Sequence, residues 1–291
     1  MQMHKAIKSA QAVAALRAAT QQDNINLGYQ ADYLADNFID GQYSMLAKMR
    51  PRWLRRKLIE RLHPGSYCFS IIRTQHIDKI LQQQIDSGIE QVVILGAGYD
   101  TRALRYKKVL RSVNVFELDF PPTQAYKLNQ LKQTDCNIPD NVSYIPIDFN
   151  QEDIALELKK NNFSFSKITL FIWEGVSYYL EKEVVSYILK LTAQCAKGSS
   201  IVFDYSLRSF VNGDHSTYGG KQIAHWLKKI NEPFLFGCNS DEINRFVIDN
   251  NLKLDSDFGA DELENLYLLK PDNKLLGRTL GHVRIAHCVN E

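Results

Sequence analysis

The sequence has few of the features that mark secreted, membrane or metal-bound proteins. Its five cysteines are scattered and form no C-x-x-C pair, so neither a disulfide framework nor a zinc site is indicated. The sequence has no stretch of about 18 uncharged apolar residues, the length that a helix needs to cross a bilayer. The start of the chain holds no apolar run typical of a signal peptide. We therefore expect a soluble, cytoplasmic protein with no metal and no stable membrane insertion.

An excess of charge of one sign is also missing. The chain has 35 lysines and arginines against 33 aspartates and glutamates, and its isoelectric point is about 8.2. This balance disfavours a nucleic-acid partner. The one local excess is a basic helical segment from Lys48 to Arg61, which typically forms a solvated helix face. An anionic partner or a membrane surface is the alternative.

The first third of the chain has the apolar periodicity of helices. Helices are predicted over Ala6 to Thr20, Gln30 to Asp36 and Ser70 to Ile85. From residue 91 onward, short apolar runs alternate with helical stretches, and their continuity indicates strands buried on both faces. The runs are Val92 to Leu95, Val113 to Leu118, Val142 to Ile147, Ile168 to Trp173 and Ser200 to Tyr205.

This alternation predicts a doubly wound α/β sheet. The intervening helices are expected over Thr101 to Leu110, Pro122 to Lys132, Gln151 to Lys160 and Glu181 to Ala196. Residues 206–238, rich in glycine, histidine and aromatic residues, show no clear strand. A helix capped near Ser240 and running to Asn250, and two strands over 253–258 and 281–289, complete the expected order.

Ligands of such sheets bind at the carboxyl ends of the strands. The first strand ends in LGAGYDTR, where Gly96 and Gly98 would let a ligand approach the main chain closely. A dinucleotide fingerprint would need a third glycine where the chain has Thr101. The acidic pair Glu117 and Asp119, ending the next strand, favours a nucleoside because a carboxylate there can accept from ribose hydroxyls. The alternative is a tight turn with a surface acid.

Two later strand ends also carry polar residues. Asp148 could accept from an adenine amino group while Phe149 flanks the ring; alternatively, Asp148 only caps the helix that follows. Glu174 follows a buried strand, where an unpaired carboxylate would cost several kcal/mol, so it needs a cationic or hydroxyl partner.

Four segments together resemble the leucine carboxyl methyltransferase family of S-adenosylmethionine-dependent enzymes: LGAGYDTR, FELDFP, IDFN and WEGVSYYL. The resemblance covers roughly residues 70–205. Members of the family methylate a protein C-terminal carboxylate or polyketide-type natural products. The resemblance implies a class I methyltransferase, Rossmann-like doubly wound sheet. It further implies a helical N-terminal extension over 1–88 and a core over 89–291 with a lid insertion at about 206–238.

The resemblance also implies roles for single residues. Arg73 would pair with the methionine carboxylate of S-adenosylmethionine, which a bidentate guanidinium suits. The remaining implied contacts are Gly96 and Gly98 to the methionine moiety, Asp119 to the ribose, Asp148 and Phe149 to the adenine, and Glu174 to the methionine amino group. The chain departs from bacterial relatives at Gly41 to Ser44, where they often carry an Asp-Pro pair.

The methyl acceptor sets the need for a catalytic base. A carboxylate acceptor is ionised at pH 7 and needs none, whereas a phenol would want one. Candidates lie in the insertion, at His215 and His225, and His215 and Tyr178 are the predicted catalytic residues. Tyr178, Tyr179 and Tyr205 could also wall an acceptor pocket.

We therefore expect an S-adenosylmethionine-dependent O-methyltransferase that acts on a carboxylate or hydroxyl of a small natural-product-like molecule. A protein C-terminal carboxyl methyltransferase, with a peptide terminus as partner, is the first alternative. A cofactor-binding protein without turnover and a nicotinamide dehydrogenase are the others. The missing third glycine, and the lack of an evident Tyr-x-x-x-Lys arrangement, stand against the dehydrogenase. The oligomeric state stays open.

Overall fold

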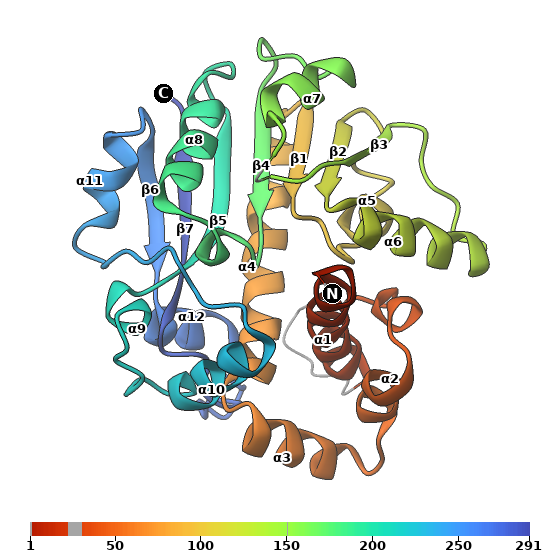
Figure 1. Cartoon of the computed structure of the whole chain (residues 1–291), viewed down its shortest axis with the longest axis vertical. Coiled ribbons are helices and arrows are strands. Elements are labelled where there is room, and N and C mark those ends of the chain that lie inside the picture. Colours follow the sequence, from red (N-terminus) through yellow and green to blue (C-terminus); the bar gives the residue numbers. More distant parts are fainter. Residues whose placement is uncertain (1, 23–30, 150) are drawn as a thin grey trace.

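The computed structural model describes residues 2–22, 31–149 and 151–291 of the chain. Its centre is one seven-stranded sheet in the order β3-β2-β1-β4-β5-β7-β6 (Figure 1), in which β7 runs antiparallel to both neighbours and the first five strands are parallel. The sequence-based prediction of a doubly wound α/β sheet is confirmed. The strands are β1 (Gln91–Leu95), β2 (Asn114–Asp119), β3 (Val142–Pro146), β4 (Thr169–Trp173), β5 (Ser200–Ser206), β6 (Lys253–Phe258) and β7 (Val283–Val289).

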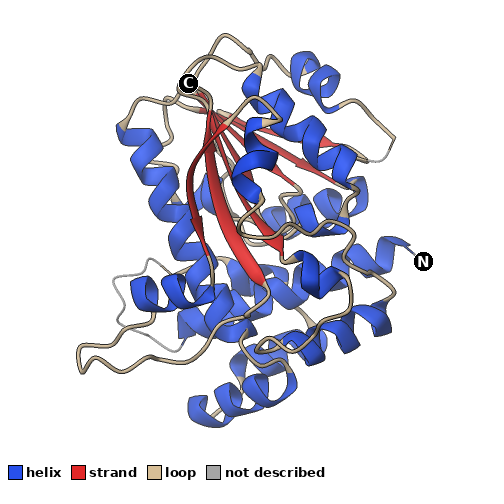
Figure 2. Cartoon of the chain, turned by 90° about the vertical axis from the view of Figure 1, so that its left-hand side faces the viewer, coloured by secondary structure: helices blue, strands red, loops and turns tan. Residues whose placement is uncertain are grey.

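Helices cover both faces of this sheet (Figure 2). Alternate residues of the central strands face opposite layers: Val93 and Leu95 pack with α7, α8 and α11, whereas Val92 and Ile94 pack with α4 and α12. Burial on both faces explains why these strands read as continuous apolar runs. The covering helices are α4 (Ser66–Asp86), α5 (Arg102–Arg105), α6 (Pro121–Gln133), α7 (Ile154–Lys160), α8 (Lys182–Ala193), α11 (Ile243–Ile248) and α12 (Ala260–Tyr267).

A second group of helices lies across the carboxyl ends of the parallel strands, at the lower side of Figure 1. Apolar residues of α1, η1 and α2 share one cluster with Leu131 of α6, which ties the start of the chain to the sheet layer. These elements are α1 (Gln2–Gln22), η1 (Ala35–Phe38), α2 (Gly41–Lys48), α3 (Arg52–Leu62), η2 (Ser177–Tyr179), α9 (Arg208–Val211) and α10 (Gly220–Ile230).

Several expected helices differ from the observed ones. Residues 206–238 contain the helices α9 and α10, which were not predicted, and the role of this segment as a lid stays a prediction. Of the helix expected over residues 30–36, only a 3₁₀ turn forms at Ala35–Phe38, and residue 30 lies outside the described residues. The helix expected over residues 101–110 ends at Arg105, after one turn.

Other differences concern capping and proline. The helix expected to begin at Ser240 spans only Ile243–Ile248, and no side chain caps it. The basic run from residue 48 to residue 61 is split because Pro51 precedes α3, where a proline ring ends one helix and begins the next. The proposed domain division at residue 88 stays a prediction. α4, which lies before that division, packs into the same apolar cluster as β1, β2 and β4.

A buried ion pair fixes α6 against β2. The ammonium of Lys127 donates to the carboxylate of Glu117, and the side chains of both residues are about 1% exposed. Burial raises the pKa of Glu117 to about 7, although the nearby Lys127 ammonium acts in the opposite direction. Lys127 contacts only Oε2 of this carboxylate, and the buried Oε1 has no hydrogen-bond partner among the described residues.

We expect Lys127→Ala to lower the free energy of unfolding by about 3–5 kcal/mol, because the Glu117 carboxylate would stay buried without its cation. Urea denaturation of the purified protein measures this loss. Lys132→Ala, on the exposed face of the same helix, should change the value by less than about 0.5 kcal/mol. Equal effects of the two substitutions would contradict the structural role of the pair.

Candidate functional site

The carboxyl ends of β1, β4 and β5 meet at the point where the order of strands reverses, which is where ligands of such sheets bind. Gly96 and Gly98 follow β1, Glu174 follows β4, and Asp204 lies near the end of β5. Helix α4 crosses behind these strands and brings Arg73 to the same place. The structure therefore brings Arg73 and Glu174 together, from positions far apart in the sequence.

Arg73 lies between two carboxylates. Its Nε is 3.0 Å from Oε1 of Glu174, and its Nη1 donates to Oδ2 of Asp204 at 2.8 Å. The other oxygen of Asp204 accepts from the backbone N–H of Gly175 at 2.7 Å. Burial raises the pKa of Asp204, and Arg73 and this N–H act against that shift. Sequence reasoning missed Asp204, because it reads as one more residue of a buried strand.

Glu174 also joins Arg73 to a second arginine. Nη1 of Arg102 donates to Oε2 of Glu174 at 2.7 Å, and Nε of Arg102 donates to Oδ1 of Asp78 at 2.6 Å. Burial alone would raise the pKa of Glu174, but Arg102 and Arg73 outweigh it and lower that pKa to about 2. Glu174 is thus an anion at any physiological pH, with the cationic partner that the sequence required.

These contacts continue into one connected set, which we call the arginine network. Arg105 pairs with Asp78 at 3.0 Å, and Arg17 of α1 pairs with Asp32 at 2.9 Å and donates to the carbonyl of Tyr99 at 2.6 Å. No side chain in the network is more than 9% exposed. Its members are Arg17, Arg73, Arg102, Arg105, Asp32, Asp78, Asp100, Glu174 and Asp204.

The network holds four guanidiniums and five carboxylates, which leaves one net negative charge when all are ionised. The DTR part of the LGAGYDTR motif supplies three of its contacts. Asp100 accepts from the N–H and the guanidinium of Arg102, and Thr101 donates to Asp32 at 2.8 Å. The motif could be recognised in the sequence. Its partners, which lie 24 to 72 residues away, could not.

The turn after β1 contains two glycines with positive φ angles. Gly96 has a φ of +64°, and a Cβ at this position would lie 2.5 Å from Cγ2 of Val176. Gly98 has a φ of +49°, and its N–H donates to Asp119. A larger residue at Gly96 would force this turn away from the end of β4.

The two acids of β2 have different environments. Asp119 is half-buried at the end of the strand, where it accepts from the N–H groups of Gly98 and Phe120. Burial raises the pKa of Asp119 to about 6, against the effect of those hydrogen bonds. Glu117 lies two residues deeper and is paired with Lys127. Asp119 is therefore the acid of this pair that faces the site.

Asp148 and Phe149 are half-buried after β3, which β2 separates from β1. Asp148 accepts from the side-chain amide of Gln151 at 3.0 Å. The cap of α7 is Asp153, which accepts from the N–H groups of Ala155 and Leu156, so the alternative that Asp148 caps this helix is wrong. Gly96, Asp119 and Asp148 lie at the carboxyl ends of β1, β2 and β3, so they form a row in the order of these neighbouring strands.

Beside the arginine network lies an aromatic cluster that joins η2 to the 206–238 segment. The ring centre of Tyr178 lies 4.2 Å from the ring centre of Phe234, and the ring centre of Phe234 lies 5.6 Å from that of Phe210. The ring of Phe210 contacts the ring of His215, with 5.0 Å between the ring centres, and stacks on the ring of His282, with 3.9 Å between the ring centres. We define this cluster as Tyr178, Tyr179, Phe210, His215, Phe234 and His282.

The predicted catalytic residues both belong to this cluster but lie apart. Tyr178 is buried next to Arg73, since a Cβ at Gly175 would lie 3.2 Å from Nη1 of Arg73 and 3.6 Å from the Tyr178 hydroxyl. Burial raises the pKa of Tyr178 well above that of a free phenol. His215 reaches Tyr178 only through Phe210 and Phe234.

Two further candidates lie elsewhere, and one residue was missed. Tyr205 donates to Asp257 at 3.0 Å, and His225 is exposed on α10. His282, at the start of β7, is fully buried, and burial lowers its pKa to about 3. Neither of its ring nitrogens has a hydrogen-bond partner among the described residues. Nothing in the sequence around His282 marked it, because its neighbours come from the distant 206–238 segment.

Comparison with known proteins places the chain in a family. The leucine carboxyl methyltransferase family matches residues 10–193, more than half of the chain. YktD of Bacillus subtilis, provisionally named an S-adenosyl-L-methionine-dependent methyltransferase, is 29% identical over 215 residues, which are 73% of this chain and 70% of YktD. A relative with the same provisional assignment in Mycobacteroides abscessus is 30% identical over 181 residues, which span 60% of this chain and 56% of that protein.

Solved structures support the fold. A provisionally assigned methyltransferase from Thermobifida fusca superposes with a TM-score of 0.58 at 18% identity, covering 97% of this chain and 94% of that one. A second structure, a DUF574 family protein from Streptomyces avermitilis, gives a TM-score of 0.56 at 12% identity, covering 83% and 91%. The chain thus belongs to the leucine carboxyl methyltransferase family, whose members are S-adenosylmethionine-dependent methyltransferases.

Proposed function

We propose that the protein transfers the methyl group of S-adenosylmethionine to an oxygen atom of a small natural-product-like molecule, at a carboxylate or a hydroxyl. The observation that carries this proposal is the junction at Gly175. There the charged arginine network, suited to the donor, meets the aromatic cluster, suited to an apolar acceptor. A charged half and an apolar half side by side match a polar cofactor and a hydrophobic acceptor.

The charges of the network fit the donor. S-adenosylmethionine carries a carboxylate, an ammonium and a sulfonium, and therefore one net positive charge, opposite to the net charge of the network. Arg73 and Glu174 neutralise each other at 3.0 Å. The methionine part of the cofactor carries one carboxylate and one ammonium. Its carboxylate would pair with Arg73, and its ammonium would pair with Glu174.

The other contacts follow the row of strand ends. Gly96 and Gly98 would line the methionine part. A Cβ at Gly98 would have no neighbour closer than 3.8 Å, whereas Val176 fills the corresponding space at Gly96. Asp119 would accept from the ribose hydroxyls while it remains anchored by the N–H of Gly98. Asp148 and Phe149 would bind the adenine at the end of β3.

Bound S-adenosylmethionine supplies an electrophilic methyl group on its sulfonium. The protein's part is to hold the acceptor oxygen in line with that group in a dry pocket. The aromatic cluster excludes water and packs the acceptor. Tyr178 stays protonated at neutral pH because its pKa is raised, so it can donate a hydrogen bond to the acceptor but cannot serve as a base. A phenol acceptor would need His215 for that role.

The aromatic cluster favours a small, partly aromatic acceptor over a peptide C-terminus. A peptide terminus would fit an open basic groove beside the methyl position, whereas Tyr178, Phe210 and Phe234 offer apolar surface there. The 206–238 segment supplies Phe210, His215 and Phe234. We therefore assign this segment to the acceptor side of the site, as its lid.

Product analysis tests the proposed chemistry. The protein is incubated with deuteriomethyl S-adenosylmethionine and a panel of aromatic and polyketide carboxylic acids and phenols, and products are read by mass spectrometry. We expect a labelled product for an acid or a phenol. Treatment at pH 12 then separates a methyl ester, which hydrolyses, from an aryl ether, which does not. Transfer confined to nitrogen or carbon acceptors would contradict the proposal.

The role of Arg73 can be isolated with two ligands. S-adenosylhomocysteine has the amino-acid carboxylate, whereas 5′-methylthioadenosine lacks it. Arg73→Lys retains the buried charge but loses the bidentate fork, so we expect it to weaken S-adenosylhomocysteine about tenfold and to change 5′-methylthioadenosine less than twofold. Isothermal titration calorimetry measures both affinities.

Two controls accompany this measurement. Asp119→Ala should weaken both ligands by similar factors, because both contain the ribose, and the exposed Arg245→Lys should affect neither. If Arg73→Lys weakens both ligands equally, Arg73 does not hold the carboxylate.

His215→Ala separates the two kinds of acceptor. With a carboxylate, kcat should change less than threefold because no proton has to be removed. With a phenol that His215 deprotonates, kcat should fall about a hundredfold or more, while the affinity for S-adenosylhomocysteine stays unchanged. Loss of cofactor affinity in this variant would place His215 on the donor side instead.

A further inference from the structure

We propose that helix α3 and the end of α2 form a docking surface for an anionic lipid bilayer. This basic–aromatic face lies at the outer edge of the molecule, below α4 in Figure 1 and opposite the edge that carries α7. It is separate from the strand ends of the donor site. We define it by the exposed residues of α3 that share one side of the helix, Trp53, Leu54, Lys57 and Arg61, together with the exposed Met45, Lys48, Arg50 and Arg52 that precede them.

Large apolar side chains are concentrated on this face. Trp53 is 66% exposed, Met45 is 76% exposed and Leu54 is 42% exposed. Single exposed apolar residues are common and need no explanation, but a group of them marks an interaction site. Trp53 is notable because Trp173 is fully buried and Trp226 is half-buried. A tryptophan that is mostly in water suits the interface between lipid headgroups and acyl chains.

The charge of the face is of one sign. Between residues 45 and 62 the only acid is Glu60, which is half-buried and accepts from Gly65 and the hydroxyl of Tyr218. The exposed charges are all cationic. Basic residues interspersed with tryptophan and leucine on one helix are typical of helices that lie on anionic membranes.

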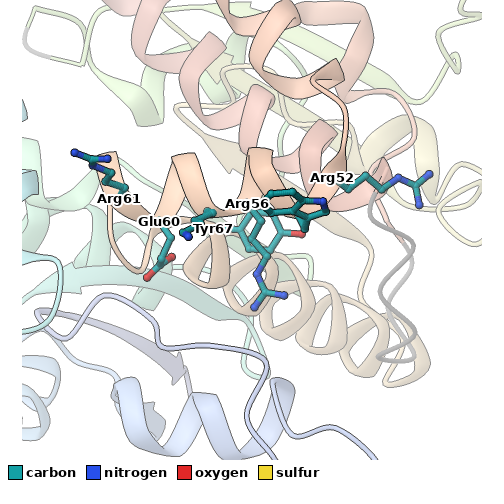
Figure 3. A pocket seen from close by; sticks show the side chains of 7 residues that line it. Arg52, Arg56, Glu60, Arg61 and Tyr67 are labelled. Carbon is teal, nitrogen blue, oxygen red and sulfur yellow. The ribbon is translucent and has the colours of Figure 1, made fainter.

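A hollow beside Trp53 could receive a headgroup. It measures about 570 Å³, and Figure 3 shows it between α3 and the start of α4. The guanidinium of Arg56 lies 5.5 Å from the centre of the Tyr67 ring in this hollow. The lining side chains are Arg52, Trp53, Arg56, Lys57, Glu60, Arg61 and Tyr67.

A bilayer matches these observations better than an acidic polypeptide does. An acidic peptide would contact only the cations, and the three exposed apolar side chains of the face would then stay in water. On a bilayer both kinds of side chain are satisfied, because the apolar ones enter the interface while the cations contact phosphates. The association is peripheral: among the described residues, no helix is long and apolar enough to cross a membrane.

Vesicle binding tests the proposal. The full chain is mixed with vesicles of phosphatidylcholine alone or with 30% phosphatidylglycerol, and binding is followed by sedimentation and by tryptophan emission. We expect at least about tenfold stronger binding to the anionic vesicles, a blue shift that Trp53→Ala abolishes, and release at about 1 M salt, where charges are screened.

Charge reversal provides a matched pair of variants. Lys57→Glu with Arg61→Glu should weaken binding to the anionic vesicles about tenfold or more. Lys107→Glu with Lys108→Glu, an equal charge change at exposed residues after α5, should change it less than twofold. Both variants should bind S-adenosylhomocysteine as the unmodified protein does, which shows that they are folded. If the first variant does not fold, the salt titration and Trp53→Ala still decide.

Three outcomes would overturn the proposal. Equal binding to both kinds of vesicle would exclude recognition of anionic lipid. An equal loss in the two charge-reversed variants would mean that net charge alone drives binding. Binding of a polyglutamate peptide without binding of anionic vesicles would identify the face as a site for acidic polypeptides instead.

Discussion

Charges removed from water must neutralise one another, and the arginine network shows how far this requirement shapes the protein. A buried charge that loses its partner costs several kcal/mol. Arg73 of α4, Glu174 after β4 and Asp204 of β5 therefore hold these three elements in fixed positions. Through Arg102 and Arg17 the same requirement reaches α5 and α1. The same ion pairs therefore hold the elements at this edge of the sheet together and form the candidate site.

Local patterns were sufficient to predict most of the sheet. β1, β4 and β5 are buried at every position, so each reads as a mostly apolar run. The glycine turn was found from its motif, and Arg73 was implied by the resemblance to the family. The partner of Arg73, by contrast, lies 131 residues away in Asp204. Such a pairing leaves no periodicity in the sequence. Only the buried acid itself, within an apolar strand, could have indicated that a cation lies opposite.

The two acids of β2 have different partners because they lie at different distances from the end of the strand. Glu117 and Asp119 point to the same face of the sheet because side chains repeat every second residue. Glu117 lies beneath α6 and is paired with Lys127, whereas Asp119 lies where the strand ends and reaches Gly98. Sequence spacing marked both as candidates, and only the packing of α6 distinguishes them. Helix α10, within residues 206–238, was missed although Ile223, Leu227 and Ile230 recur at helical spacing.

The burial of α4 has a consequence for how this scaffold can change. Fourteen of its 21 residues are buried, so two thirds of its positions are constrained by packing or by the arginine network. The segment that supplies Phe210, His215 and Phe234 contacts the site from outside the sheet and is built from short helices and turns. Phe236 and Cys238 anchor this segment in the core of the sheet. Under the proposed function, changes confined to the rest of the segment would alter the shape of the acceptor pocket while the constraints on α4 stay in place.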